Sequence, residues 1–173
     1  FPNAVQTMLD PADCGPACIS LCQDIQGQTF EYPEEFFKER IHSIRRPRPD
    51  DFQIKEAAEK IKKSKNPIII SGGGVFYSNA MEELSNFATK HNIPVTQTVM
   101  GYSTMKRDHS HYAGQIGGLG GKNTNDLAKE TDLAIAVGTK LSDFTTGSWA
   151  NFENEEFKLV SINVSRFDAN KHL

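Results

Sequence analysis

The residues best suited to chemistry lie in two glycine-rich stretches. Gly72, Gly73 and Gly74 directly follow the apolar run at residues 67–70, and residues 114–121 hold five more glycines. Backbone N–H groups at a turn between a strand and a helix bind anions, phosphate above all. The first chemistry to consider is therefore binding of a nucleotide or another phosphate.

Neither stretch completes a common phosphate-binding motif. The dinucleotide fingerprint needs glycine where Tyr77 stands, and an acidic residue at the end of the next strand, where Thr98 stands. The P-loop motif needs glycine at Ile116 and serine or threonine at Asn123. Tight turns that require glycine for their backbone conformation, with no ligand, are the alternative. Both interpretations stay open at this point.

Two other groups of residues have side chains that bind metals or perform catalysis. His109 and His111 form a His-x-His pair, but no nearby set of acidic or thiol side chains completes a site, so a surface loop is expected. Cys14, Cys18 and Cys22 are spaced too widely along an extended segment to surround one ion. We expect reduced, buried thiols there, and we assign no catalytic residue and no metal ligand.

Composition excludes several classes of protein. The 173 residues carry a formal net charge of −3, which suits neither DNA nor RNA, and 38% are apolar, enough for a core. The longest apolar runs, such as residues 133–137, are far shorter than a membrane span. No secretory leader is visible, and reduced cysteines fit the cytoplasm. The start at Phe1 and the end at Leu173 lead us to expect a piece of a longer protein.

Strands and helices alternate from residue 50 onward. Asp50 or Asp51 is expected to cap a first helix, with a stripe at Ile54, Ala57, Ala58 and Ile61, and Asn123 or Thr124 to cap a helix over 125–130. Strands are predicted at 67–70, 94–98, 133–137 and 158–164, with a short one near Tyr112. This alternation predicts an α/β fold in three layers (α/β/α), with an open parallel sheet and right-handed crossovers.

The part before residue 50 has a different organisation. A strand is predicted at residues 16–21, within a first segment of residues 1–22. Residues 23–49 hold several prolines and lack sustained periodicity, which is typical of a linker. Its basic cluster, Arg45, Arg46 and Arg48, has acidic neighbours, so a solvated linker is favoured over an anion site.

The order of these segments resembles the thiamine-diphosphate-dependent enzymes. The resemblance is carried by Gly15-Pro16 before a strand, by Arg45-Arg46-Pro47, by residues 67–74 and by the stretches 112–120 and 132–143. It implies that residues 1–22 end a pyrimidine-binding domain and that residues 50–173 are the Rossmann-like central domain. That domain has six strands in the order 3-2-1-4-5-6, and its last strand is expected to be missing here.

Two stretches are similar to one branch of that family, the trihydroxycyclohexanedione hydrolases of myo-inositol breakdown. They are residues 23–34, with Gln23-Asp24-Ile25-Gln26 and Tyr32-Pro33-Glu34, and residues 141–149. The resemblance implies cleavage of a C–C bond in a cyclic 1,2-diketone to give 5-deoxyglucuronate. It implies thiamine diphosphate and Mg²⁺ in a homodimeric or homotetrameric full-length enzyme. Their binding motifs lie outside this sequence, so the fragment is expected to be inactive and to bind neither.

The resemblance also locates a candidate crevice. The first and fourth strands of such a sheet are neighbours, and ligands bind beyond strand ends at this switch point. The candidate residues are Gly72, Gly73, Gly74, Asp143, Thr145 and Thr146. In acetolactate synthases the crevice holds FAD, which is not expected here. A vestigial nucleotide pocket, a wall of the active site and plain packing turns remain open. So do two other functions, the central domain of an acetolactate synthase and a stand-alone nucleotide-binding module.

Overall fold

The computed structural model describes residues 1–171, and the chain divides into two compact units at Arg48 and Pro49. The first unit contains α1 (Pro2–Met8), α2 (Gln23–Gln26) and the 3₁₀ helix η1 (Glu34–Phe37). A proline opens α1, where its fixed backbone angle suits a helix start. The remaining residues of this unit have no regular secondary structure.

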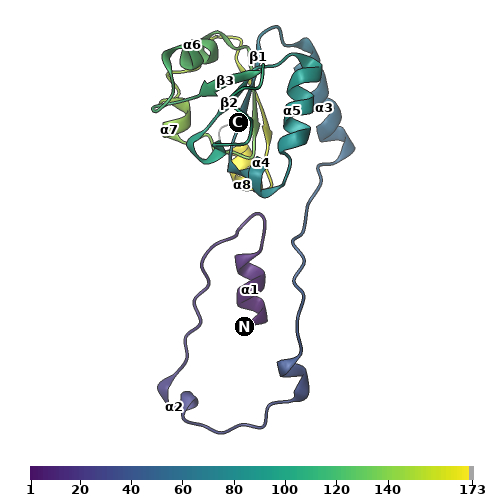
Figure 1. The fold of residues 1–173 in the computed structure, drawn as a ribbon, viewed down its shortest axis with the longest axis vertical. Coiled ribbons are helices and arrows are strands. Elements are labelled where there is room, and N and C mark those ends of the chain that lie inside the picture. The colour runs from purple at the N-terminus through teal and green to yellow at the C-terminus, as the bar shows by residue number, and fades with distance from the viewer. Residues whose placement is uncertain (172–173) are drawn as a thin grey trace. The chain divides into compact units, whose positions relative to one another are not determined.

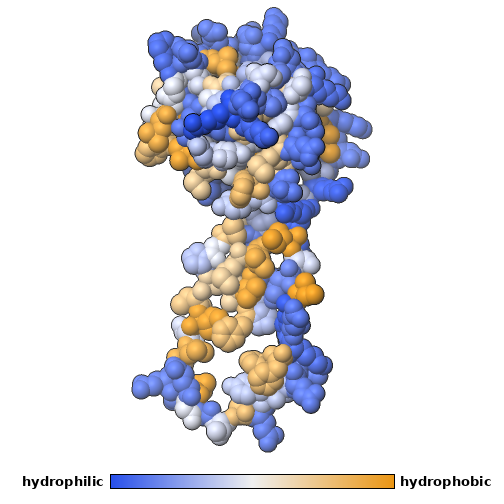
Figure 2. All heavy atoms as spheres, viewed as in Figure 1, coloured by the Kyte–Doolittle hydropathy of each residue, from blue (hydrophilic) through white to orange (hydrophobic). Residues whose placement is uncertain are grey.

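Two expectations for the first unit are wrong. Residues 16–21 form no strand, because no other segment of this unit supplies a neighbouring strand for their backbone hydrogen bonds. Cys14, Cys18 and Cys22 are free and exposed rather than buried, since no apolar layer covers them here. Large apolar side chains are exposed throughout this unit, and they give it much of the orange in Figure 2.

The second unit is built on a five-stranded parallel sheet (Figure 1). Its strands pair in the order β3-β2-β1-β4-β5. They are β1 (Pro67–Ser71), β2 (Val95–Gln97), β3 (Tyr112–Gln115), β4 (Leu133–Val137) and β5 (Lys158–Ile162). Ile69 lies between Val95 on one side and Ile135 on the other, which makes β1 the central strand. The predicted α/β class and strand order are confirmed for these five strands, and a sixth strand does not occur within residues 1–171.

Helices cover both faces of this sheet. In Figure 1, α3 and α5 lie on one side and α6 and α7 on the other. These four helices are α3 (Asp51–Lys63), α5 (Met81–His91), α6 (Lys122–Glu130) and α7 (Asp143–Thr146). The other short helical segments are α4 (Gly73–Tyr77), the 3₁₀ helix η2 (Val99–Gly101) and α8 (Arg166–Asn170). Within residues 1–171, no helix combines the length and the apolar character that crossing a bilayer requires.

The alternation of side chains along β1 divides the core into two layers. Ile69 packs with Leu84 and Ala88 of α5, whereas Ile68 and Ile70 pack on the opposite face with Ala128 of α6. All three isoleucines are at most 1% exposed. A strand that is buried on both faces explains the uninterrupted apolar sequence at this position.

Local capping interactions set the ends of the helices. The Asp50 carboxylate accepts a hydrogen bond from Gln53 N–H at 2.8 Å and caps α3, as predicted. The prediction for α6 is wrong, because Asn123 and Thr124 lie inside the helix and Gly121 occupies the cap. The Thr124 hydroxyl donates instead to the Ala113 carbonyl at 2.6 Å and so ties α6 to β3.

Asp132 closes the turn between α3 and β1. Its carboxylate accepts hydrogen bonds from the Ser64 hydroxyl, from Lys65 N–H at 2.7 Å and from Asn66 N–H at 3.1 Å. Burial alone would raise the pKa of Asp132, but these hydrogen bonds outweigh it and lower the pKa below its ordinary value. The charged carboxylate therefore stabilises the folded chain.

Replacing Asp132 with asparagine should lower the free energy of unfolding by about 1–2 kcal/mol at neutral pH, since hydrogen bonds to a charged, partly exposed acceptor are lost. Because folding lowers this pKa, the stabilisation exists above the unfolded value and disappears as the pH falls through the folded one. In urea titrations, the difference in the free energy of unfolding between the two chains should therefore shrink as the pH is lowered through the acidic range. Asp126→Asn, which removes an exposed pair with Lys122, is the control and should change little. A constant difference at all pH values would contradict this role.

Candidate functional site

The switch point between β1 and β4 brings the two predicted loops together. The Gly72 N–H donates to the Val137 carbonyl at 2.8 Å, and the Gly74 N–H donates to the Gly138 carbonyl at 2.9 Å. These two donors are therefore used within the protein and are not available to an anion. The first glycine stretch joins the two loops rather than forming an open cradle.

Backbone packing explains why glycine is needed here. A Cβ atom on Gly74 would lie 2.6 Å from the Gly138 Cα, and one on Gly72 would overlap the Gly138 carbonyl oxygen. Gly138 itself has a φ of +59°, in the left-handed region that glycine adopts without cost. Gly73 has more room, since its Cβ would meet the Met100 carbonyl oxygen at 3.0 Å. The loops thus meet through their main chains.

The second half of the candidate set lies on α7. Thr145 and Thr146 are 8% and 0% exposed, whereas Asp143 is exposed at the start of the helix. The Thr146 hydroxyl donates to the Ser142 carbonyl at 3.3 Å and accepts from Trp149 N–H at 3.1 Å. Of the three α7 candidates, Asp143 alone presents its polar group at the surface.

The loop around α7 has an unusual backbone. Leu141, Ser148 and Trp149 have φ values of +50°, +55° and +68°, which cost free energy in residues with side chains. Such conformations persist only where surrounding contacts hold them, and they concentrate at functional sites. The segment from Gly138 to Trp149, which follows β4, therefore holds several residues in costly backbone conformations.

Asn125 also holds a loop of this site, although no sequence pattern marks it. Its side chain accepts from Gly117 N–H at 2.9 Å and donates to the Gly117 carbonyl at 3.1 Å, so it holds both polar groups of one loop residue. Asn151 donates to the same Asn125 oxygen at 3.3 Å. The Gly118 N–H donates to the Phe144 carbonyl at 2.7 Å. The second glycine-rich stretch is thus fixed against α7, and an asparagine within a helix gives no sequence signal of this.

A buried polar network holds the loop after β2. The Gln97 side chain donates to the Thr104 hydroxyl at 3.2 Å and to the Met105 carbonyl at 3.0 Å. The Thr104 hydroxyl also bonds the Ser71 hydroxyl at the end of β1 and donates to the Gly101 carbonyl at 2.7 Å. Gln97, Thr104 and Ser71 are all nearly or fully buried. Their hydrogen bonds fix the loop rigidly against the ends of two strands.

The switch point offers no open backbone cradle for a diphosphate group. Within residues 1–171, no three histidine, cysteine or acidic side chains are grouped so that they could hold a metal ion. Two of the three glycine N–H groups at the switch point are already bonded, and the space a ligand would need beside Gly74 is filled by Gly138.

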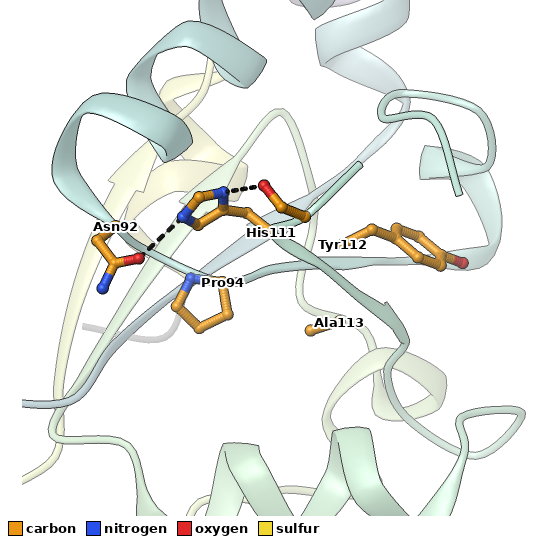
Figure 3. Close-up of a pocket in the computed structure, with 6 residues that line it drawn as sticks. Asn92, Pro94, His111, Tyr112 and Ala113 are labelled. Atoms are coloured by element: carbon orange, nitrogen blue, oxygen red, sulfur yellow. Dashed lines mark hydrogen bonds between the residues drawn. The ribbon is translucent and has the colours of Figure 1, made fainter. Parts of the chain in front are cut away.

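A separate pocket of about 420 Å³ lies at the opposite edge of the sheet (Figure 3). His111 lies beside it, with one ring nitrogen 3.0 Å from the Asn92 side-chain oxygen and the other 3.0 Å from the Ser110 hydroxyl. His109 and His111 are half-buried, with ring centroids 5.7 Å apart. The pocket lies where β2 and β3 begin, so it is distinct from the switch point at the carboxyl ends of β1 and β4.

Comparison with known proteins agrees with this fold. A family model described as "Thiamine pyrophosphate enzyme, central domain" matches residues 54–173. The chain belongs to the thiamine pyrophosphate enzyme family. The match begins within α3 and includes all five strands, so the whole sheet described above is part of the central domain of this family.

Individual relatives in the family point to one branch. The chain is 48% identical over 169 residues to a 3D-(3,5/4)-trihydroxycyclohexane-1,2-dione hydrolase of Clostridium botulinum strain Alaska E43, covering 98% of this chain and 26% of that protein. The hydrolase of the same name from Clostridium perfringens strain 13 is 46% identical, and hydrolase 1 of Bacillus cereus strain ZK is 44% identical, with the same coverage. The chain spans about a quarter of the length of these relatives. The resemblance to the thiamine enzymes is thus confirmed.

The main-chain contact at the switch point predicts a sharp difference between two glycines. Gly74→Ala should lower the free energy of unfolding by about 1–3 kcal/mol, because the new methyl group overlaps Gly138. Gly118→Ala is the matched control, since its Cβ would meet only Phe144 atoms at 3.8 Å or more, and it should stay within about 0.5 kcal/mol. Urea denaturation measures both. Equal costs for the two variants would show that the loops do not meet as described.

Proposed function

We propose that this chain is the central domain of a thiamine-diphosphate-dependent hydrolase that cleaves a C–C bond in trihydroxycyclohexane-1,2-dione. The observation that carries the proposal is the 48% identity to a relative of that name over 98% of the chain. The proposed product is 5-deoxyglucuronate, and the proposed setting is inositol catabolism in the cytoplasm.

The proposed organisation assigns the chemistry to other parts of the full-length enzyme. Residues 1–22 would end the pyrimidine-binding domain. Residues 23–49 would link it to the central domain, residues 50–173, whose last strand follows. Thiamine diphosphate and Mg²⁺ would be held in a homodimer or homotetramer by residues outside this chain.

The role proposed for the candidate residues is architectural. Gly72 and Gly74 support it because their N–H groups bond the neighbouring loop, and Thr145 and Thr146 support it because both are buried. Together with Gly73 and Asp143, these residues form the proposed wall, and Asp143 is its exposed polar group. We propose that the wall faces the active site of the assembled enzyme and that it binds neither FAD nor another nucleotide.

Substrate choice by the full-length enzyme tests the proposal. With thiamine diphosphate and Mg²⁺ added, the full-length enzyme should consume trihydroxycyclohexane-1,2-dione and release 5-deoxyglucuronate. Chromatography of the product measures this reaction. Pyruvate is the control substrate, since condensation of pyruvate to acetolactate would assign the protein to a different branch of the family. Turnover of pyruvate but not of the cyclic dione would overturn the proposal.

Calorimetry on this chain tests the assignment of the cofactor to other parts of the enzyme. Titration with thiamine diphosphate and Mg²⁺, with FAD or with ADP should release no binding heat, because the donors at the switch point are already bonded. The full-length protein is the positive control and should bind thiamine diphosphate. Magnesium-dependent binding of thiamine diphosphate by this chain alone, or saturable binding of either nucleotide, would contradict the proposed wall.

A further inference from the structure

The pocket at the amino ends of β2 and β3 combines apolar surface with three polar side chains. Its lining residues are Asn92, Pro94, Ser110, His111, Tyr112 and Ala113. Figure 3 shows Pro94 and Ala113 on one side of the His111 ring and the Tyr112 ring directed away from it. The volume of about 420 Å³ lies in the range of pockets that hold small molecules.

His109 has a structural role beside this pocket, because each of its ring nitrogens has a partner within the protein. Its Nδ1 accepts a hydrogen bond from His111 N–H at 3.1 Å. The Thr89 hydroxyl donates its hydrogen to the Ser85 carbonyl at 2.9 Å, so it can only accept from His109 Nε2, which lies 3.4 Å away. His109 is thus fixed as one neutral tautomer, and it holds the loop of residues 106–111 on α5.

His111 differs from His109 because its ring can take up a proton without losing a contact. Its Nε2 lies 3.0 Å from the Asn92 side-chain oxygen, which can only accept, so Nε2 carries a hydrogen. Its Nδ1 lies 3.0 Å from the Ser110 hydroxyl, which donates to a neutral ring and accepts from a protonated one. Protonation of His111 therefore frees the Ser110 hydroxyl hydrogen to bond a ligand.

The charges on the neighbouring segments favour an anion in this pocket. The titratable side chains at the end of α5 and in the loop before β3 are Lys90, His91, Lys106, Arg107, Asp108 and His109. Only one of them is acidic. Arg107 is directed at Tyr102, since its guanidinium lies 5.3 Å from the centre of that ring and donates to the hydroxyl at 3.0 Å. A local excess of positive charge in a chain of net charge −3 attracts anions to this place.

We propose that this pocket binds a small monocarboxylate and that His111 takes up a proton from solvent when the ligand binds. The carboxylate accepts from the freed Ser110 hydroxyl beside the positively charged His111 ring, and the apolar part of the ligand lies on Pro94 and Ala113. A carboxylate is favoured over a phosphate, because the lining includes no lysine or arginine and His111 supplies at most one positive charge. The site does not depend on the proposed activity.

Calorimetric titration of the full-length enzyme with benzoate tests the proposed site. At about pH 7.5, where free histidine is mostly neutral, binding should be saturable and should take up a proton. Proton uptake is measured by comparing the heats in two buffers with different enthalpies of ionisation. Benzamide has the same shape without the charge, and it should bind at least tenfold more weakly (roughly). No saturation with benzoate below about 10 mM, or equal affinity for benzamide, would overturn the proposal.

Two variants establish where the benzoate binds. Ser110 is exposed, so Ser110→Ala should leave the fold intact and weaken benzoate binding about tenfold through the loss of a hydrogen bond to a charged group. His111→Gln should weaken binding and also abolish the proton uptake. His91→Gln is the control, because His91 stacks on Phe87 and does not line the pocket, and it should retain both.

Three further outcomes decide against the proposed site. Unchanged benzoate affinity in Ser110→Ala would place the ligand elsewhere in the enzyme. Proton uptake that persists in His111→Gln would assign the proton to another group. Inorganic phosphate that binds more tightly than benzoate would show that the pocket selects a different class of anion. None of these measurements uses turnover, so the carboxylate site and the proposed activity can fail separately.

Discussion

The close approach of main chain to main chain between the loops after β1 and β4 is the constraint on which the site depends. Three glycines, Gly72, Gly74 and Gly138, remove the Cβ atoms that would otherwise separate these loops. Hydrogen bonds from the first two to the residues that end β4 then lock the contact. The switch point of this sheet is consequently filled by protein, where the same place in many α/β folds opens to bind a ligand.

Other hydrogen bonds fix the remaining loops at the carboxyl ends of the strands. The buried network of Gln97, Thr104 and Ser71 attaches the segment after β2 to the end of β1. The hydrogen bond from Gly117 N–H to the Asn125 side chain attaches the segment after β3 to α6. The bond from Gly118 N–H to the Phe144 carbonyl joins the same segment to α7. Each loop is fixed by polar groups turned inward.

Sequence patterns predicted the second unit well because its elements are determined by local and short-range physics. Residues 67–70 are apolar without interruption because β1 is covered on both faces, and the Asp50 cap acts over three residues. The predictions that failed depend on distant partners. Residues 16–21 have strand-like composition but no neighbouring strand, and Thr124 bonds Ala113 of β3 instead of capping α6. The hydrogen bonds between Asn125 and Gly117 could likewise not be predicted from the sequence, because they depend on how the folded loop meets α6.

A structure of the full-length enzyme with thiamine diphosphate bound would test most directly whether this domain positions the catalytic parts without holding the cofactor. The account predicts that the diphosphate contacts residues outside this chain and that the Gly74–Gly138 contact remains closed. It would be contradicted by a structure in which the loops separate and Gly72, Gly73 and Gly74 bind the diphosphate through their N–H groups.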